Sequence, residues 1–161
     1  MKIDNATLDA KMAAFRRQCR EAGLRLTPQR QEVYRELAQA SDHPSAEMVH
    51  KRVIRRLPTM TLDTVYRTLG TLEEIGLAER VTVVRNTARF DGNTETHHHF
   101  ICKNCGVIVD VHSDRLDQLG IERDLPNGFQ LHSWQVELRG LCPNCARQKT
   151  NPADDSWHAG E

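Results

Sequence analysis

Two cysteine pairs place the strongest constraint on how this chain can fold. Cys102 and Cys105 form the first C-x-x-C pair, and Cys142 and Cys145 form the second. Four thiolates in two such pairs suit a closed tetrahedral zinc site, so we expect structural zinc here. The 36 residues between the pairs must then return the second pair to the first. A redox-active pair is the alternative, but the duplicated motif and the lack of a helix start at Cys102 disfavour it.

Charge and hydropathy restrict the location and the partners of the protein. No stretch resembles a signal peptide or a membrane-spanning segment, so we expect a cytoplasmic protein without membrane contact. Residues 1–80 carry 14 basic and 11 acidic side chains, whereas residues 81–161 carry 8 and 11. This difference has the sign expected of a DNA-facing first half and a cation-binding second half.

Four stretches of the first half have the periodicity of short helices, each preceded by a residue that can cap it. The expected ranges are residues 7–22, 28–40, 46–56 and 62–75, and the expected N-caps are Thr7, Thr27, Ser45 and Thr61. The fourth helix has a continuous apolar stripe. Its opposite face is polar and carries Thr64, Arg67, Thr68 and Thr71, with Tyr66 to one side.

Two strand patterns, at residues 77–84 and 88–91, follow the fourth helix and are joined by a short turn. Short helices followed by a β-hairpin are the order of a winged helix-turn-helix, in which one helix enters the DNA major groove. An ordinary small helical domain with a solvated polar face fits the same pattern.

Three consecutive histidines precede the first cysteine pair on a segment with strand character. Alternation along a strand places His97 and His99 on one face and His98 on the other. Asp91 lies just before them, and Asp110 lies on the next predicted strand. Two imidazoles with one or two carboxylates suit iron(II), manganese(II) or zinc. A solvated polar strand is the alternative.

His43 lies at the break between two predicted helices and is followed by Pro44. Alone, such a residue is most often an ordinary surface or hinge residue. If it ligated the same metal as the second-half histidines, bound metal would favour one arrangement of the two halves.

The remainder of the second half is expected to contain a short helix after Ser113 and a strand over residues 129–140. The sequence after Cys145 is polar and without periodicity, and we expect it to be poorly ordered. Trp157 and His158 in this tail are expected to be bystanders rather than ligands.

In combination, these motifs resemble the ferric uptake regulator family of bacterial metalloregulators. The matching stretches run in the family's order and are LRLTPQR (24–30), DHPSAEMV (42–49), TLDTVYRTLGTLEEIGL (61–77), RFD (89–91), HHHFICKNCG (97–106), VIVDV (107–111) and LCPNC (141–145). The resemblance implies an α+β chain that forms a homodimer on a palindromic double-stranded DNA operator. Its parts would be a winged-helix DNA-binding domain (1–84), an α/β dimerisation domain with the four-cysteine zinc site (85–148) and a disordered tail (149–161).

The same resemblance assigns site residues. The regulatory metal, Fe2+ or Mn2+ with Zn2+ possible in vitro, would be held by His43, Asp91, His97, His99 and Asp110. Tyr66 and Arg67 match the family's recognition helix, and Arg30 matches a phosphate contact that would position the protein rather than specify sequence. Thr64, on the polar face of the same helix, completes the expected DNA-binding set.

Two carboxylates point to one branch of the family. Iron sensors resemble one another in having Glu where this chain has Asp91, whereas peroxide sensors have Asp, and residue 110 is also Asp. In the peroxide-sensing branch, bound iron(II) reacts with peroxide and oxidises a ligand histidine, here expected to be His43 or His97. The expected function is a peroxide-sensing repressor. The alternative within the family is an iron or zinc uptake repressor that senses metal availability only.

An enzyme is not expected, because a small non-haem iron or zinc enzyme would need an acid–base or nucleophile constellation that the sequence lacks. A further metal site common in the family is incomplete here. Asp117 and His132 fall at matching positions, but Thr96 stands where a histidine is common and His98 where an Asp is common. The site is either absent or rebuilt around His98, Asp117 and His132.

Overall fold

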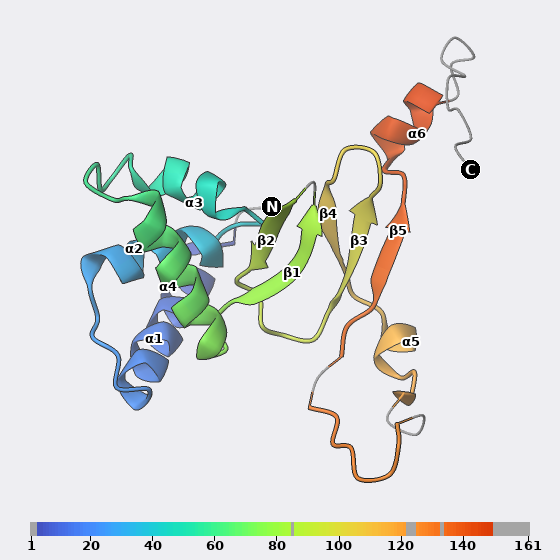
Figure 1. Ribbon diagram of the computed structural model, residues 1–161, viewed down its shortest axis with the longest axis horizontal. Helices are drawn as coiled ribbons and strands as arrows, with labels where there is room; N and C mark the ends of the chain where they lie inside the picture. Colours follow the sequence, from blue (N-terminus) through green and yellow to red (C-terminus); the bar gives the residue numbers. More distant parts are fainter. Residues whose placement is uncertain (1–2, 85, 122–124, 133, 150–161) are drawn as a thin grey trace. The chain divides into compact units, whose positions relative to one another are not determined.

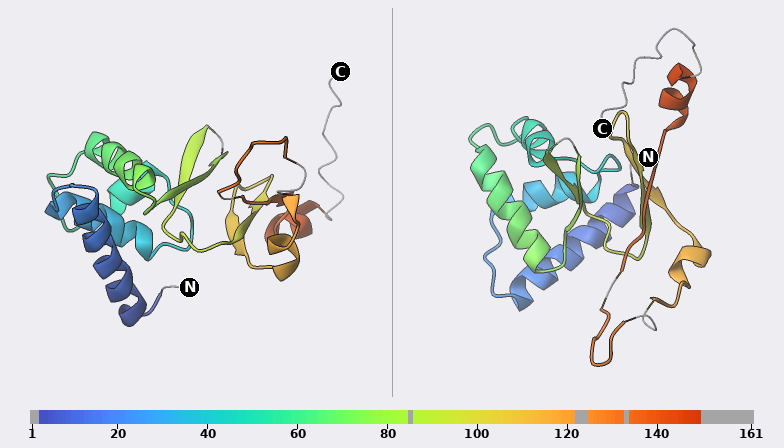
Figure 2. Two further views of the ribbon diagram at one scale, coloured as in Figure 1. Left: turned by 90° about the horizontal axis from the view of Figure 1, so that it is seen from below. Right: turned by 45° about the vertical axis from the view of Figure 1, so that its right-hand side comes forward.

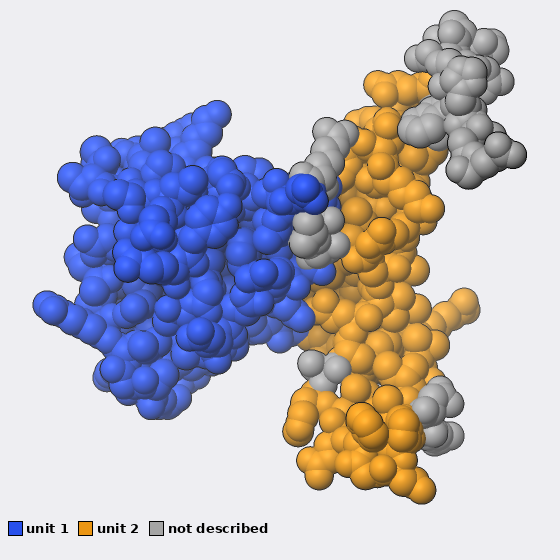
Figure 3. All heavy atoms as spheres, viewed as in Figure 1, with its two compact units in different colours: residues 1–95 blue, residues 96–161 orange. Residues whose placement is uncertain are grey.

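The computed structural model describes residues 3–84, 86–121, 125–132 and 134–149 (Figures 1 and 2). The chain divides into two compact units, residues 1–95 and residues 96–161 (Figure 3). Among the described residues, no helix has the length and apolar character needed to cross a membrane.

Side-chain caps determine where the helices of the first unit begin. These helices are α1 (Asn5–Glu21), α2 (Pro28–Ala38), α3 (Ala46–Val53) and α4 (Leu62–Glu74). The predicted caps of α2, α3 and α4 are confirmed, because Thr27, Ser45 and Thr61 each accept a hydrogen bond from the backbone N–H three residues later. The prediction for α1 is wrong. Asp4 is the cap, and Thr7 is the residue whose N–H donates to it, at 2.8 Å.

The core of the first unit forms where α2 contacts α1, α3, α4 and strand β2 (Figure 1). The rings of Phe15 and Tyr34 stack between α1 and α2 with centroids 4.7 Å apart. Strands β1 (Glu79–Val84) and β2 (Thr87–Asp91) pair as an antiparallel hairpin. Helices followed by this hairpin confirm the predicted winged helix-turn-helix order.

The second unit contains a three-stranded sheet of order β4-β3-β5. Strand β4 (Ile108–Val111) is antiparallel to β3 (His98–Cys102), whereas β5 (Glu137–Gly140) is parallel to it. A parallel neighbour requires a crossover, and the chain from α5 (Asp114–Asp117) onward supplies it. Helix α6 (Pro143–Lys149) follows β5 (Figure 2).

The strand predicted over residues 129–140 is wrong in its first part, because pairing begins only at Glu137. The N–H of Val136 donates to Nδ1 of His98 at 3.1 Å, so a side chain takes the place of a ladder partner. Residues 125–132, which precede this point, are exposed, and the side chain of Phe129 is 69% exposed. Ser133 lies outside the described residues.

Two further sequence predictions concern boundaries. The predicted domain boundary between residues 84 and 85 falls within the β1–β2 hairpin, and hairpin pairing places both strands in the first unit. The predicted tail partly overlaps α6, which was not expected from the polar sequence after Cys145. Residues 150–161 lie outside the described residues, Trp157 and His158 among them.

Gly92, directly after β2, provides a test of this packing. A Cβ at Gly92 would lie 2.9 Å from the carbonyl oxygen of Leu37 in α2, a backbone atom that cannot turn aside. We expect Gly92→Ala to lower the free energy of unfolding by about 1–3 kcal/mol. The matched control is Gly70→Ala in α4, where a Cβ meets nothing within 4 Å. Because alanine favours the helix, this substitution should raise the free energy of unfolding by up to about 1 kcal/mol. Urea unfolding followed by circular dichroism measures both; equal effects would contradict the close contact.

Candidate metal centres and DNA-binding surface

The first cysteine pair lies on a tight turn at the end of β3. The N–H of Cys102 donates to the carbonyl of Val107, and the N–H of Gly106 donates to the carbonyl of Cys102, both at 2.9 Å. Gly106 has a φ of 75°, a conformation that glycine adopts without steric cost. The turn therefore presents the two sulfurs of Cys102 and Cys105 on one side of the strand end.

The second pair has a different local structure. Cys142 directly precedes α6, and Cys145 lies in its first turn. The two pairs share the same C-x-x-C spacing, but the first lies on a turn and the second on the start of a helix. The overlooked signal is Pro143, because proline is favoured at the first position of a helix.

The four sulfur atoms nevertheless converge. They all lie within 4.8 Å of one another, and Cys105 Sγ and Cys142 Sγ are 3.7 Å apart. A zinc ion with four sulfurs at about 2.3 Å has sulfur–sulfur edges of about 3.8 Å. All four cysteines are free thiols rather than disulfides. The cluster thus fits a structural zinc site in both chemistry and dimensions.

Electrostatics in this cluster also favour a cation. The pKa of Cys102 is lowered to about 6, chiefly because the backbone N–H groups of Cys105 and Cys142 point at its sulfur. The hydrogen bond with Asn104 lowers the pKa of Cys145, but hydrogen bonds with the other three thiols and burial raise it by more. The pKa of Cys145 is therefore raised to about 11. Four crowded thiols cannot all ionise without a cation among them, and bound zinc requires thiolates.

The histidine run of the second unit separates into two faces, as alternation predicted. Nε2 of His97 lies 3.0 Å from Nε2 of His99, and 4.0 Å from Oδ1 of Asp110 on β4. Both imidazoles are buried. Ligands at about 2.1 Å from a metal and at right angles are about 3 Å apart, so the two nitrogens have the spacing of neighbouring ligands.

His98 points the other way and has its own partners. Its Nε2 lies 3.0 Å from Oδ1 of Asp117, and its ring lies against Trp134 with centroids 5.3 Å apart. His132 is exposed and, among the described residues, no third histidine, cysteine or carboxylate joins His98 and Asp117 as a ligand group. Of the three residues around which a further site could be rebuilt, the structure brings together only His98 and Asp117.

The first unit contributes a second group of ligand-type side chains. Nε2 of His43, in the loop between α2 and α3, lies 3.2 Å from Oδ2 of Asp91 at the end of β2. His43 is 3% exposed and Asp91 is 5% exposed. Burying such polar groups is costly unless they are paired or coordinate a metal. Nitrogen and oxygen donors of this kind suit iron(II) or manganese(II) better than the thiolates do.

Three of the four predicted DNA-binding residues lie around a hollow of about 400 Å³ on the first unit. Thr64 and Arg67 of α4 and Arg30 of α2 line it, together with Thr68 and Thr71 from the same face of α4. Gln29 and Met60 also line it, and no sequence signal indicated them. No carboxylate is among the described lining residues, although Arg67 pairs with Asp63 at 3.0 Å.

Tyr66 is 44% exposed but is not among the lining residues. Its hydroxyl donates to Glu47 of α3. Hydrogen bonds from Ser45 and from Tyr66 hold the pKa of Glu47 below its usual value, so the acceptor is a carboxylate. The structure thus connects α3 and α4 through this pair, which the sequence did not indicate.

Comparison with known proteins agrees with these features. The model of the ferric uptake regulator family matches residues 21–139. The chain belongs to the ferric uptake regulator family. The peroxide-responsive repressor PerR of Staphylococcus epidermidis is 30% identical over 148 residues, which cover 92% of this chain and 99% of the relative. The peroxide operon regulator of Bacillus subtilis is 34% identical over 132 residues, covering 82% and 91%.

Solved structures of ferric uptake regulator family proteins share the fold. The ferric uptake regulator of Helicobacter pylori superposes with a TM-score of 0.72 at 22% identity, covering 91% of this chain and 97% of that one. The Pseudomonas aeruginosa regulator with manganese gives a TM-score of 0.67 at 27% identity, with coverage of 80% and 97%. A zinc uptake regulator complexed with zinc and DNA gives a TM-score of 0.63 at 26% identity, covering 89% of this chain and 98% of that one.

Removing one sulfur tests the four-cysteine site. We expect Cys142→Ser to lose stoichiometric zinc and to unfold the second unit at lower temperature, because metal-binding free energy is part of folding free energy. The matched control is Cys19→Ala, which removes the buried cysteine of α1 and should keep zinc. Elemental analysis and thermal unfolding measure the two effects. Retention of full zinc content by Cys142→Ser would contradict the assignment.

Proposed function

We propose that this protein is a metal-dependent, DNA-binding transcriptional repressor that senses peroxide through oxidation of a ligand histidine. The observation that carries the proposal is the division of five nitrogen and oxygen ligands, four of them buried, between the two units. His43 and Asp91 belong to the first unit, and His97, His99 and Asp110 belong to the second. The similarity to proteins named as peroxide-responsive repressors supports the peroxide signal.

In this proposal, the five residues hold one iron(II) or manganese(II) ion, and the four cysteines hold zinc permanently. An ion that takes ligands from both units favours the arrangement in which they converge. The DNA-binding unit is then held in the orientation that suits a palindromic operator. The protein acts in the cytoplasm.

The repressor would act as a homodimer. The described residues of the second unit leave large apolar side chains on its surface, including Val109 at 50% exposure and Leu138 at 37%, on the two edge strands of the sheet. Exposed apolar groups on edge strands are typical of a surface that a second copy covers.

Bound iron would supply the redox chemistry by which peroxide oxidises a ligand histidine: one peroxide oxygen would enter the imidazole ring and the other would leave as water. The chain's own part is to hold the imidazoles of His43 and His97 at the metal and to keep bulk water from their buried rings. Oxidation of either ring would weaken that residue as a metal ligand, and the arrangement that the metal favours would then be lost. A repressor that responds to metal availability alone, the alternative, would bind the same ions without this oxidation.

Mass spectrometry separates the two alternatives. We expect iron-loaded protein treated with stoichiometric peroxide to gain one oxygen atom on His43 or His97 and to release DNA. Protein loaded with manganese is the control, and His50 and His132 are internal controls, since His50 faces the carbonyl of Met60 and His132 is exposed. Unmodified His43 and His97, with DNA still bound, would establish the metal-availability alternative instead.

The DNA-binding surface is tested independently of the signal. We expect Arg67→Ala to weaken binding to a duplex selected from random DNA by the wild-type protein, by about 1–3 kcal/mol. Arg30→Ala should weaken DNA binding by the same factor for all sequences, because it removes a phosphate contact. The slope of log binding constant against log salt concentration should become shallower by about 1. The charge-matched control is Arg115→Ala on α5, an exposed arginine that belongs to the second unit rather than to the DNA-binding unit. Titration at several salt concentrations measures each effect; equal losses in all three variants would exclude the hollow as the interface.

A further inference from the structure

His43 has an unusual backbone conformation for a buried residue that is not glycine. Its φ is 44°, in the left-handed region, and Pro44 follows it directly. Such a conformation persists only where the surrounding structure enforces it, and it is concentrated at functional sites. Some contact must therefore hold this turn.

Arg89, on strand β2, provides that contact. Its Nε donates to the carbonyl oxygen of His43, and its Nη2 donates to the carbonyl oxygen of Asp42 at 2.8 Å. The N–H of the next residue, Phe90, donates to the carbonyl oxygen of Pro44 at 3.1 Å. Three consecutive carbonyls of the turn are thus bound by two consecutive residues of one strand.

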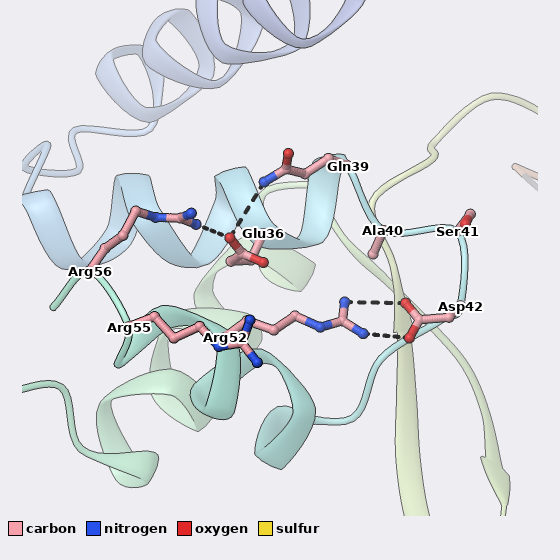
Figure 4. Close-up of a pocket in the computed structure, with 8 residues that line it drawn as sticks. All are labelled: Glu36, Gln39, Ala40, Ser41, Asp42, Arg52, Arg55 and Arg56. Atoms are coloured by element: carbon pink, nitrogen blue, oxygen red, sulfur yellow. Dashed lines mark hydrogen bonds and ion pairs between the residues drawn. The ribbon is translucent and has the colours of Figure 1, made fainter. Parts of the chain in front are cut away.

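A second arginine holds the same turn through its side chain. Arg52 of α3 forms a bidentate ion pair with the carboxylate of Asp42, with Nη1 3.2 Å from Oδ1 (Figure 4). The turn is therefore tied to α3 on one side and to β2 on the other. Of the two contacts, only that of Arg89 reaches the backbone of His43.

The strand that carries Arg89 also supplies a ligand. Asp91 is two residues further along β2, so alternation places its side chain on the same face as that of Arg89. One strand face therefore sets the backbone of His43 and presents the carboxylate that lies 3.2 Å from its Nε2. The planar guanidinium suits this task because its donors form a fixed fork.

We propose that Arg89 is a positioning residue that presets the His43–Asp91 half of the regulatory metal centre. The inference rests on the proposed function, because it assumes that His43 and Asp91 are ligands. Arg89 acts through the backbone of residues 42 and 43, and it orients the imidazole before metal arrives. Loss of such outer contacts lowers metal affinity about 10- to 100-fold in other metal sites.

The test uses full-length, zinc-loaded protein in two measurements. We expect Arg89→Ala and Arg89→Lys to lower Mn2+ affinity about 10- to 100-fold while zinc content stays complete. Without added manganese, both variants should accelerate hydrogen exchange of the Phe90 amide and leave the amides of α4 unchanged. The lysine variant keeps the charge but not the fork, and it remains informative if the alanine variant fails to fold.

Arg80→Ala is the matched control. Arg80 belongs to the same hairpin, but it pairs with Glu73 at 3.1 Å and lies over the ring of Phe90 rather than on the turn. It should leave Mn2+ affinity unchanged. Unchanged Phe90 exchange in both Arg89 variants, or accelerated exchange with unchanged Mn2+ affinity, would overturn the inference.

A ligand variant separates this inference from the proposed function. His43→Ala should lower Mn2+ affinity at least as much as Arg89→Lys does. If His43→Ala lowers the affinity and Arg89→Lys does not, only the positioning role fails. If His43→Ala also leaves the affinity unchanged, the proposed ligand set fails, and the positioning role fails with it.

Discussion

The second unit depends on the convergence of four cysteine sulfurs, which fits a bound zinc ion. Among its described residues, the buried hydrophobic side chains are few: Ile101, Ile108, Cys102 and Cys145. Three short strands with so small a core cannot offset the conformational entropy lost on folding, and small units of this kind need a metal, a disulfide or a partner. Zinc at the four cysteines would join the end of β3 to the start of α6, and the proposed second copy would cover the exposed apolar edge strands. Zinc and a second copy would both stabilise the second unit, whose own hydrophobic core is too small to do so alone.

The first unit is organised differently, and this difference bears on the role of its proposed metal ligands. Its described core includes aromatic and aliphatic side chains from all four helices and from β2. A unit with such a core does not need metal in order to fold. His43 and Asp91 are instead attached to a rigid frame, through the turn held by Arg89 and through the close approach of Gly92 to α2. Rigid attachment lets an exchangeable metal act on the position of the whole unit, which is what the proposed repressor requires.

Sequence patterns predicted the local features well and the features that depend on tertiary contacts poorly. Cysteine spacing indicated the sulfur cluster, and strand alternation separated His98 from its two neighbours, because both follow from chain geometry alone. The strand predicted over residues 129–140 was wrong in its first part, since an alternating pattern does not reveal that a histidine ring takes the N–H of Val136. Arg89 was missed for a similar reason: its carbonyl partners are more than forty residues away in sequence.

The geometry around Asp91 bears on why an aspartate at this position would suit peroxide sensing. Its Oδ1 accepts the N–H of Asn93 at 2.7 Å, while its Oδ2 faces His43. This hydrogen bond uses one lone pair of Oδ1 and so favours metal binding through Oδ2 alone. The longer side chain of glutamate would reach past this turn and could present both. A single-oxygen ligand gives a lower coordination number, and a metal centre reacts with peroxide only where a coordination position is open. On the proposed function, the Asn93 turn therefore contributes to reactivity by limiting what Asp91 can bind.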